Sequence, residues 1–424
     1  MIFKIRLCSA AIAALLATSA FIAPALANES GCVTSYDSAT DYFPDKVEVK
    51  HGAGFSITYT NNAKYIRNTV SGENYVLYQC GTPEPTDASA TPAGSLQVGN
   101  WTKVAAVPGK KVVLDSAPAS AIMELLGVQD MVAASYKFFE VTSPCMQKRL
   151  AALPRIAQNF GTPATRRRSL VRRVSYDLAN SDLQWTFTTY GMNDPRSFAL
   201  NPESASDMLG KAEWIKFVAA FFNKESEANK LFADIEARYT ACKQRLAQGA
   251  KKTVGFARYN KVANGTVTSW TIDKPQGWIV QGMADAGLSA YAGDTRAFTN
   301  AADFYKAASD WDVLIDTSIE PLSHGGATIP LWQNLLSGYA LDDQANSASV
   351  KALPFMVSNA IYRSDLISSL QNATDYNEHL QIHVDTLLDD FGKLAAADAS
   401  GTTWYRNLPH QVQVDWRSPS DCTN

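Results

Sequence analysis

The sequence predicts an α/β protein built from two α/β lobes that are joined by one long linker helix, with a β-rich extension at the N-terminus. Three observations predict this architecture. A strand–helix–strand pattern occupies residues 110–134, apolar residues recur every three or four positions across residues 206–248, and strands and helices alternate again after residue 251. Such alternation indicates parallel-type sheets flanked by helices.

The size and charge of the chain narrow the class of protein. The chain has 424 residues, of which 46% are hydrophobic and 19% are charged, which is typical of globular proteins with several domains. With 38 basic and 41 acidic residues, the formal net charge is −3. Because nucleic-acid binding needs a basic surface that neutralises phosphates, we predict no nucleic-acid partner.

Residues 1–27 are predicted to be a signal peptide. Lys4 and Arg6 precede an apolar run that reaches Ile22, and the small-x-small sequence Ala25-Leu26-Ala27 is typical of a cleavage site. We therefore expect cleavage near Ala27 and a secreted or periplasmic protein, which could also remain at the cell surface. A bacterial periplasm and a eukaryotic secretory route both remain open.

Residues 28–107 are predicted to form the β-rich extension and a linker. Alternating patterns predict strands at 47–49, 55–59 and 75–78, with turns at Asn61-Asn62 and Ser71-Gly72. Residues 81–98 are rich in Pro, Thr, Ala and Gly, a composition that indicates a linker or surface loop.

Residues 108–205 are predicted to form the N-terminal α/β lobe. The apolar strand 111–114 precedes a helix at 119–126, which Gly127 ends, and a second strand follows at 131–134. This βαβ pattern is the start of a parallel sheet, and 183–188 is predicted to be a further strand.

Residues 206–248 are predicted to be the linker helix, with Asn223 as the candidate break. Acidic residues occur early in the tract, and Lys243 and Arg245 occur late, as the helix dipole favours. Its apolar positions are Trp214, Phe217, Val218, Phe221, Leu231, Phe232, Ile235, Tyr239, Cys242 and Leu246.

Residues 249–400 are predicted to form the C-terminal α/β lobe, and residues 401–424 a C-terminal tail. The strands expected in this lobe lie at 252–257, 311–315 and 360–362, and its helices at 278–286 and 379–391.

Five cysteines follow the predicted cleavage site, and exported cysteines tend to pair. We predict a disulfide between Cys32 and Cys80, and a second candidate pair is Cys145 with Cys242. An equally supported interpretation of Cys242 is a buried thiol, because it lies on the apolar stripe of the linker helix.

Common catalytic motifs are absent from the sequence, which contains no G-x-S-x-G, G-x-G-x-x-G or H-E-x-x-H pattern. This absence does not exclude an enzyme, because catalytic groups can be distant in sequence, but we predict no catalytic residues and no enzyme activity. His379 and His383 are four residues apart on a predicted helix, but two ligands without a third do not make a metal site. The basic segment 166–173 is either a solvated helix face or a rim that attracts anions.

Aromatic and polar residues follow several predicted strands. Because ligands of open parallel sheets bind beyond the carboxyl ends of strands, we expect these residues to line a ligand-binding cleft. Aromatic rings and Arg suit a flat or oxygen-rich anionic ligand. The candidates are Ser116, Pro118, Tyr136, Lys137, Thr189, Tyr190, Arg258, Tyr259, Trp270, Asp273 and Trp278.

Several segments resemble a known family. Residues 212–217, 221–225 and 235–239 resemble the linker helix of the helical-backbone periplasmic substrate-binding proteins of ABC importers, which bind iron–siderophore complexes and cobalamin. Residues 110–127 resemble the opening strand and helix of that family's first lobe. Residues 75–78 with 81–83 resemble the N-terminal β extension of one subgroup.

The resemblance implies a function. It implies capture of a metal chelate, most simply a ferric siderophore, in an interlobe cleft, and delivery to an ABC-importer permease by a monomer without an intrinsic cofactor. One alternative is a cobalamin or haem binder of the same fold. Another is a secreted enzyme or interaction protein that retains the fold without transport. Residues 177–180 depart from the family pattern and residues 321–349 align poorly, so the ligand is left open.

Overall fold

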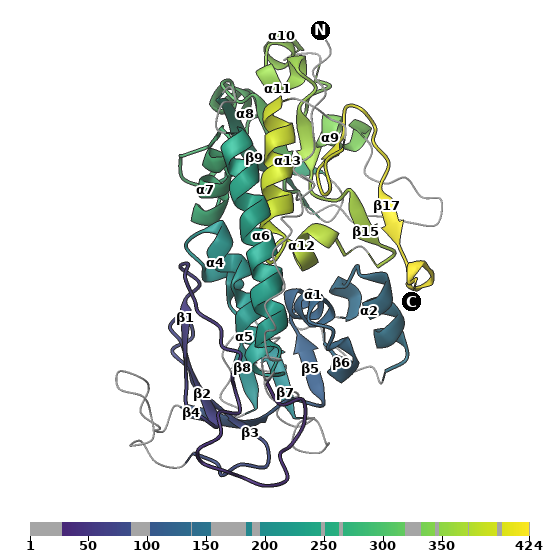
Figure 1. Ribbon diagram of the computed structural model, residues 1–424. Helices are drawn as coiled ribbons and strands as arrows, with labels where there is room; N and C mark the ends of the chain where they lie inside the picture. The colour runs from purple at the N-terminus through teal and green to yellow at the C-terminus, as the bar shows by residue number, and fades with distance from the viewer. Residues whose placement is uncertain are drawn as a thin grey trace, which may run out of the picture. The chain divides into compact units, whose positions relative to one another are not determined.

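The computed structural model describes residues 28–85, 102–136, 138–153, 184–188, 196–246, 251–262, 266–318, 332–343, 347–371, 373–396 and 401–423 (Figure 1). These residues divide into two compact units. We call residues 28–236 with 422–423 the N-terminal unit, and residues 237–421 the C-terminal unit. The predicted signal peptide, the basic segment 166–173, Lys137, Thr189 and Tyr190 lie outside the described residues.

The N-terminal unit begins with a four-stranded sheet in the order β1-β2-β3-β4. Its strands are β1 (Phe55–Tyr59), β2 (Ala63–Asn68), β3 (Asn74–Gln79) and β4 (Thr102–Val107), antiparallel except for the parallel pair β3–β4. The predicted strand at 47–49 is wrong. The backbone N–H of Val47 donates to the hydroxyl of Tyr59 at 3.2 Å, so a side chain takes the place of a neighbouring strand.

The second sheet of this unit is entirely parallel, in the order β6-β5-β7-β8. It consists of β5 (Val112–Asp115), β6 (Val132–Ser135), β7 (Trp185–Thr188) and β8 (Ser197–Ala199). The helix α1 (Ala117–Leu125) follows β5 and ends before Gly127, whose φ of 68° favours glycine. The predicted βαβ pattern is confirmed. Short 3-10 turns at Gln129–Met131 and Phe138–Glu140 and the helix α2 (Pro144–Ala151) precede β7.

The predicted linker helix is three helices in the structure. A 3-10 turn (Pro202–Ser204) leads into α4 (Met208–Ala212), α5 (Trp214–Ala220) and α6 (Glu225–Leu246). A first break falls at Glu213, between α4 and α5. The second, between α5 and α6, contains Asn223, whose φ of 55° is left-handed and therefore cannot continue a helix. Residues 225–236 of α6 belong to the N-terminal unit and residues 237–246 to the C-terminal unit.

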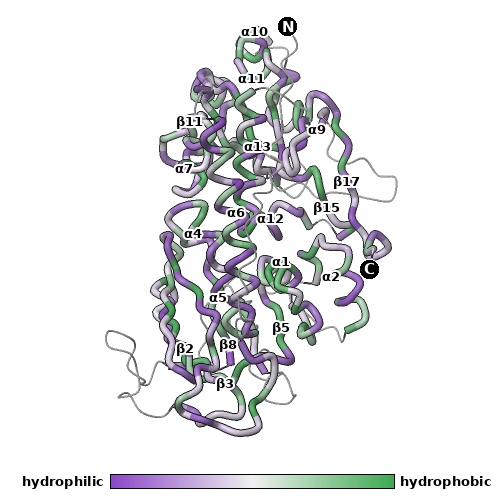
Figure 2. Tube along the Cα trace, viewed as in Figure 1, coloured by the Kyte–Doolittle hydropathy of each residue, from purple (hydrophilic) through white to green (hydrophobic). Residues whose placement is uncertain are grey.

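The helix α5 belongs to the core of the N-terminal unit. The ring of Phe217 lies 5.8 Å from that of Tyr75 in the first sheet, and the ring of Phe221 lies 4.7 Å from that of Phe198 in the second. The two sheets therefore share one aromatic core around this short helix. Figure 2 shows α1 and β5 mainly in the green of hydrophobic residues, whereas α6 carries both colours along its length.

The C-terminal unit contains a sheet in the order β12-β10-β9-β13-β14-β16, with β11 also paired to β9. The strands β9, β11, β13 and β14 are parallel, and β10, β12 and β16 are antiparallel to their neighbours. Their bounds are β9 (Lys252–Lys261), β10 (Val267–Asp273), β11 (Leu288–Ala290), β12 (Arg296–Phe298), β13 (Val313–Asp316), β14 (Ile361–Arg363) and β16 (Arg406–Asn407).

Helices and a small second sheet complete this unit. The small sheet pairs β15 (Ile367–Ser369) with β17 (Asp415–Arg417), and a 3-10 turn follows at Pro419–Asp421. The helices are α7 (Gly277–Asp285), α8 (Ala301–Ala307), α9 (Trp332–Gly338), α10 (Ser347–Lys351), α11 (Pro354–Val357), α12 (Asp375–His379) and α13 (Val384–Ala396).

The single helix predicted for residues 379–391 is wrong at its start. The helix α12 ends at His379 and α13 begins at Val384, so His379 and His383 do not share one helix. Within the part of the chain that the structure describes, no helix combines the length and the apolar character that crossing a membrane requires.

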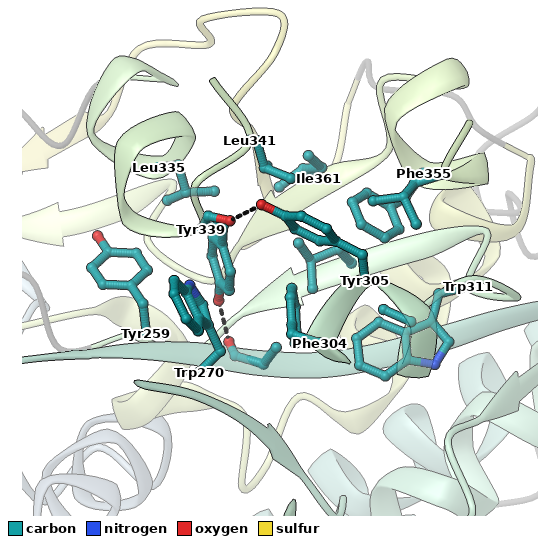
Figure 3. Packing of buried hydrophobic residues seen from close by; sticks show 14 of the residues in the cluster. Tyr259, Trp270, Phe304, Tyr305, Trp311, Leu335, Tyr339, Leu341, Phe355 and Ile361 are labelled. Carbon is teal, nitrogen blue, oxygen red and sulfur yellow. Dashed lines mark hydrogen bonds between the residues drawn. The ribbon is translucent and has the colours of Figure 1, made fainter. Parts of the chain in front are cut away.

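An aromatic cluster forms the core between the C-terminal sheet and helices α8 to α11 (Figure 3). Trp311 packs so closely on Gly255 that a Cβ atom there would lie 1.9 Å from its ring, which explains the glycine in the middle of β9. Polar atoms of the cluster are satisfied inside it. Trp270 Nε1 donates to the carbonyl of Gly338 at 2.9 Å, and the Tyr339 hydroxyl oxygen lies 2.6 Å from the carbonyl oxygen of Ala257.

Two disulfides join described residues. The predicted pair Cys32–Cys80 is confirmed. The pair Cys145–Cys242 is wrong, because Cys145 at the start of α2 is bonded to Cys422, 277 residues later. The interpretation of Cys242 as a free thiol is also wrong, since none of the cysteines in the described ranges is free. Spacing could not identify Cys422, because a disulfide is specified by proximity in the fold and not by distance along the chain.

Candidate functional site

The parallel sheet of the N-terminal unit has a topological switch point. From β5 the chain moves to β6 on one side, and it then returns to β7 on the other side. The connections that follow β5 and β7 therefore diverge, and ligands of open α/β sheets bind where this happens. Ser116 and Pro118 follow β5 at this position, while Thr189 and Tyr190, which follow β7, lie outside the described residues.

Ser116 is the N-cap residue of α1. Its side chain makes no capping hydrogen bond to the helix, although serine is a preferred cap, and Pro118 occupies the first turn. The sequence Ser-Ala-Pro thus begins a helix whose first backbone N–H groups have no intrahelical acceptor. Tyr136, at the end of β6, is 1% exposed, and its backbone N–H donates to the carbonyl of Leu114 at 2.8 Å.

The carboxyl edge of the C-terminal sheet carries paired charges. The guanidinium of Arg258 on β9 forms an ion pair with Asp273 at the end of β10. The other carboxylate oxygen of Asp273 accepts a hydrogen bond from Thr317 Oγ1 at 2.8 Å. Thr317 follows β13, and its backbone N–H donates to the carbonyl of Ala257. The Arg258 side chain is 36% exposed, so its remaining N–H donors are accessible.

A buried network lies beneath this edge. The carboxylate of Asp316 accepts hydrogen bonds from the hydroxyls of Tyr339 and Ser318 at 2.7 and 2.6 Å, and it forms an ion pair with Arg363. Arg363 also contacts Asp365, which accepts two hydrogen bonds from Arg406. The chain of charges fixes the ends of β13, β14 and β16 relative to one another.

The titration behaviour of the network follows from its burial. Burial, followed by the negative charge of Asp316, raises the pKa of Tyr339 well above its ordinary value. Burial alone would lower the pKa of Arg363, but Asp316 and Asp365 outweigh it and raise that pKa. Both shifts favour the protonated forms, so at neutral pH the Tyr339 hydroxyl keeps its proton and Arg363 is a cation.

The three aromatic candidates of the C-terminal unit are buried. Tyr259 and Trp270 belong to the aromatic cluster of Figure 3, at 5% and 9% exposure. Trp278 lies on α7 at 5% exposure, and its indole N–H donates to Gln276. Among the described candidates of this unit, Arg258 and Asp273 therefore present the accessible polar groups of this edge, and the three aromatic side chains are buried.

Sequence reasoning missed four residues of this edge, namely Thr317, Asp316, Tyr339 and Arg363. Asp316 is the last residue of the fully buried strand β13, and Thr317 follows it. An acidic residue at the end of an apolar strand is the signal that could have identified them. Tyr339 and Arg363 come from segments that the strand pattern does not connect to β13. Their proximity is a product of the fold.

Comparison with known proteins gives structural similarities alone. No family model and no curated protein matches this chain. A solved structure from an ABC-type Fe3+-hydroxamate transport system of Saccharomonospora viridis is similar over 74% of this chain and 98% of its own, with 13% identity and a TM-score of 0.45. The petrobactin-binding protein YclQ of Bacillus subtilis covers 70% of this chain and 94% of its own, with 14% identity and a TM-score of 0.43.

A third similar structure is the periplasmic haem-binding protein HutB of Vibrio cholerae. It covers 66% of this chain and 98% of its own, with 11% identity and a TM-score of 0.43. The three proteins bind or transport three different ligands.

Proposed function

We propose that this protein is an extracytoplasmic solute-binding protein that captures a metal chelate, a ferric siderophore in the simplest case, for an ABC-type importer. The observation that carries the proposal is α6, a continuous helix of 22 residues shared by two α/β units. The resemblance of residues 212–239 to the linker helix of helical-backbone binding proteins supports the same function. Nothing in this function requires covalent chemistry, and the protein is expected to release its ligand unchanged.

The hydrogen-bond donors at the carboxyl edges of the two sheets favour an anionic, oxygen-rich ligand. Arg258 pairs with Asp273 through one terminal nitrogen, and a guanidinium has five N–H donors. Its other donors can therefore bind ligand oxygens while Asp273 and Thr317 hold its position. Ser116 and the first turn of α1 supply further donors in the N-terminal unit. Because Tyr259 and Trp270 are buried, oxygen contacts at this edge are favoured over the stacking that a haem would need.

Ligand titration tests the proposal directly. Ferric hydroxamate, catecholate and carboxylate chelates are added to the mature protein, and tryptophan fluorescence is followed; quenching that saturates in the micromolar range is expected for one class. Cobalamin and haem are tested by the absorbance shift of the ligand. Absence of saturable binding for all five would contradict the proposal.

A pair of arginine variants sharpens the test. Arg258→Ala should weaken binding of the anionic chelate at least about tenfold, because a charge-assisted hydrogen bond contributes roughly 1.5–3 kcal/mol. Its thermal midpoint should stay within about 2 °C of the wild type, since exposed ion pairs stabilise little. The matched control is Arg296→Ala, which removes an exposed arginine of the same sheet. Equal effects of the two variants on affinity would mean that Arg258 does not contact the ligand.

Mass spectrometry of the ligand distinguishes binding from catalysis. After overnight incubation at one-to-one stoichiometry, the chelate recovered from the protein should have its starting mass. A hydrolysed product that depends on native protein would favour the alternative of a secreted enzyme that retains the fold.

A further inference from the structure

One face of the paired strands β9 and β10 carries polar side chains. In the antiparallel register Asn260 lies opposite Ser269, and Arg258 lies opposite Thr271. The residues that alternate with them along the strands, such as Trp270, belong to the aromatic cluster of Figure 3. Because successive side chains of a strand point to opposite faces, the four polar residues share the face that is turned away from this cluster.

Hydrogen bonds fix the amide group of Asn260 on this face. Its Nδ2 donates to Thr271 Oγ1 at 3.0 Å and to Ser269 Oγ at 3.1 Å, and the carbonyl oxygen of Ser269 lies on the same side at 3.5 Å. A carbonyl oxygen can only accept, so the amino group of Asn260 is the group directed toward β10. Asn260 Oδ1 receives no hydrogen bond from any residue that the structure describes, and Asn260 is partly exposed.

Arg258 and Asn260 place a donor group and an acceptor on the same face. The two residues are two positions apart on β9, which separates them by about 7 Å. Arg258 Nη1 pairs with Asp273, and the Arg258 side chain is partly exposed, so other N–H groups of the guanidinium remain accessible. The carboxyl end of β9 therefore offers cationic donors and, two residues further, a neutral acceptor in a fixed orientation.

We propose that Asn260 is a specificity-determining residue of the solute site, and that the solute is a chelate with amide N–H groups beside its acceptor oxygens. This inference rests on the proposed function and names the class of chelate. Arg258 binds an oxygen of the chelate, and Asn260 Oδ1 accepts an N–H about 7 Å away from it. Amide groups supply both kinds of atom, whereas ionised carboxylates are acceptors only.

Thr271 and Ser269 are positioning residues in this proposal. Thr271 is 5% exposed, so its hydroxyl acts through Asn260 and not on the solute directly. Two acceptors on one amino group restrain the rotation of the Asn260 amide, and an acceptor that is oriented before binding loses less entropy when the solute arrives. The rival interpretation is structural, with Asn260 serving only to join β9 to β10.

Two matched pairs of ferric chelates test the proposal. A trihydroxamate and a tricatecholate are each prepared with secondary-amide linkers and with the same amides N-methylated, which removes the N–H groups and keeps the iron-binding groups. Both forms are titrated into the mature protein, and tryptophan fluorescence is followed. For at least one pair, the wild type should bind the secondary-amide form about fivefold more tightly, as expected for one neutral hydrogen bond.

Variants assign this preference to Asn260. Asn260→Ala should abolish the preference for the secondary-amide form, and Asn260→Val, which suits a strand better, should do the same. Asn260→Asp retains an acceptor oxygen and should therefore retain the preference. The matched control is Asn334→Ala, which removes an exposed amide of α9 and should leave both affinities within about twofold.

The outcomes separate this inference from the proposed function. Equal affinity of the wild type for both forms of each pair, or a preference that persists in Asn260→Ala and Asn260→Val, would overturn the inference and leave Asn260 a structural residue. Binding of a ferric carboxylate, cobalamin or haem, but of none of these four chelates, would also overturn it while the proposed function stands. Absence of binding for every chelate would end both.

Discussion

The carboxyl edges of the two sheets differ in how they are built. In the N-terminal unit, the described residues that follow β5 are Ser116 and the first turn of α1, which supply a hydroxyl and backbone donors. In the C-terminal unit, the corresponding edge stands on a buried chain of charges from Asp316 through Arg363 to Asp365. The N-terminal edge presents the dipoles of a hydroxyl and of backbone N–H groups. The C-terminal edge presents charged side chains that are already paired with opposite charges.

This difference separates two physical roles. Helix N–H groups are directed by the backbone and need few side-chain contacts to hold them. A guanidinium at the end of a strand is flexible unless partners restrain it, and Arg258 has Asp273 for that purpose. Substitutions in the buried network beneath the C-terminal edge should therefore reduce stability, whereas substitutions at the N-terminal edge should be tolerated.

The largest expected effect comes from the buried network. Asp316→Ala removes the acceptor of Tyr339 and Ser318 and leaves Arg363 with Asp365 alone. Breaking a buried charge pair costs about 3–5 kcal/mol, so urea unfolding should show a loss of that order. A loss below about 1 kcal/mol would mean that the two edges do not differ in this way.

A slightly smaller change in the unfolding free energy is expected when a rise in pH ionises Asp390 in the C-terminal unit. Burial raises the pKa of Asp390 to about 6, despite hydrogen bonds from Thr403 and Trp404. Its contribution to stability is complete below its unfolded pKa of 3.8 and is lost as the pH rises through about 6. Two pKa units correspond to about 3 kcal/mol. Unfolding free energies measured from pH 4 to pH 7 should show this decline, and Asp390→Asn should flatten it.

The N-terminal unit contains Lys211, a buried group whose pKa shift gives the opposite dependence of stability on pH. Burial lowers the pKa of Lys211 to about 8, against the attraction of Glu203. Its contribution to stability is present above the unfolded pKa of 10.5 and is lost as the pH falls through about 8. We expect stability to rise by about 2–3 kcal/mol between pH 8 and pH 10.5, and Lys211→Met to remove that rise. If the unfolding free energy of the variant rises with pH as it does in the wild type, other titrating groups cause the rise.

The smallest effect is expected at the N-terminal edge. Ser116→Ala removes a hydroxyl that makes no capping bond, so the unfolding free energy should change by less than about 0.5 kcal/mol. If Ser116 contacts the solute, the same variant should weaken its binding several-fold. A stability loss as large as that of Asp316→Ala would remove the contrast between the edges.

The sequence predicts well those helices, strands and turns that are determined by residues close together in the chain. The βαβ pattern around residues 111–134 followed from short apolar runs with Pro118 and Gly127 as punctuation, and the break at Asn223 was identified correctly. Cys32 and Cys80 were paired correctly within the β extension.

The parts that sequence could not supply depend on contacts between distant segments. Tyr259 and Trp270 follow strand patterns that fit a ligand-facing edge, yet helices α8 and α9 cover them. Asp316 and Arg363 are 47 residues apart in the sequence, and no local pattern connects them. An alternation pattern indicates which face of a strand is apolar, but not what covers it.

The bond between Cys145 and Cys422 has a consequence for biosynthesis. Since Asn28 hydrogen-bonds to Glu225 and Cys422 is joined to Cys145, both ends of the described chain belong to the N-terminal unit. The C-terminal unit, residues 237–421, therefore lies in the sequence between the two cysteines of this disulfide. During synthesis Cys145 emerges 277 residues before its partner, so the disulfide can form only after the C-terminal unit has been made.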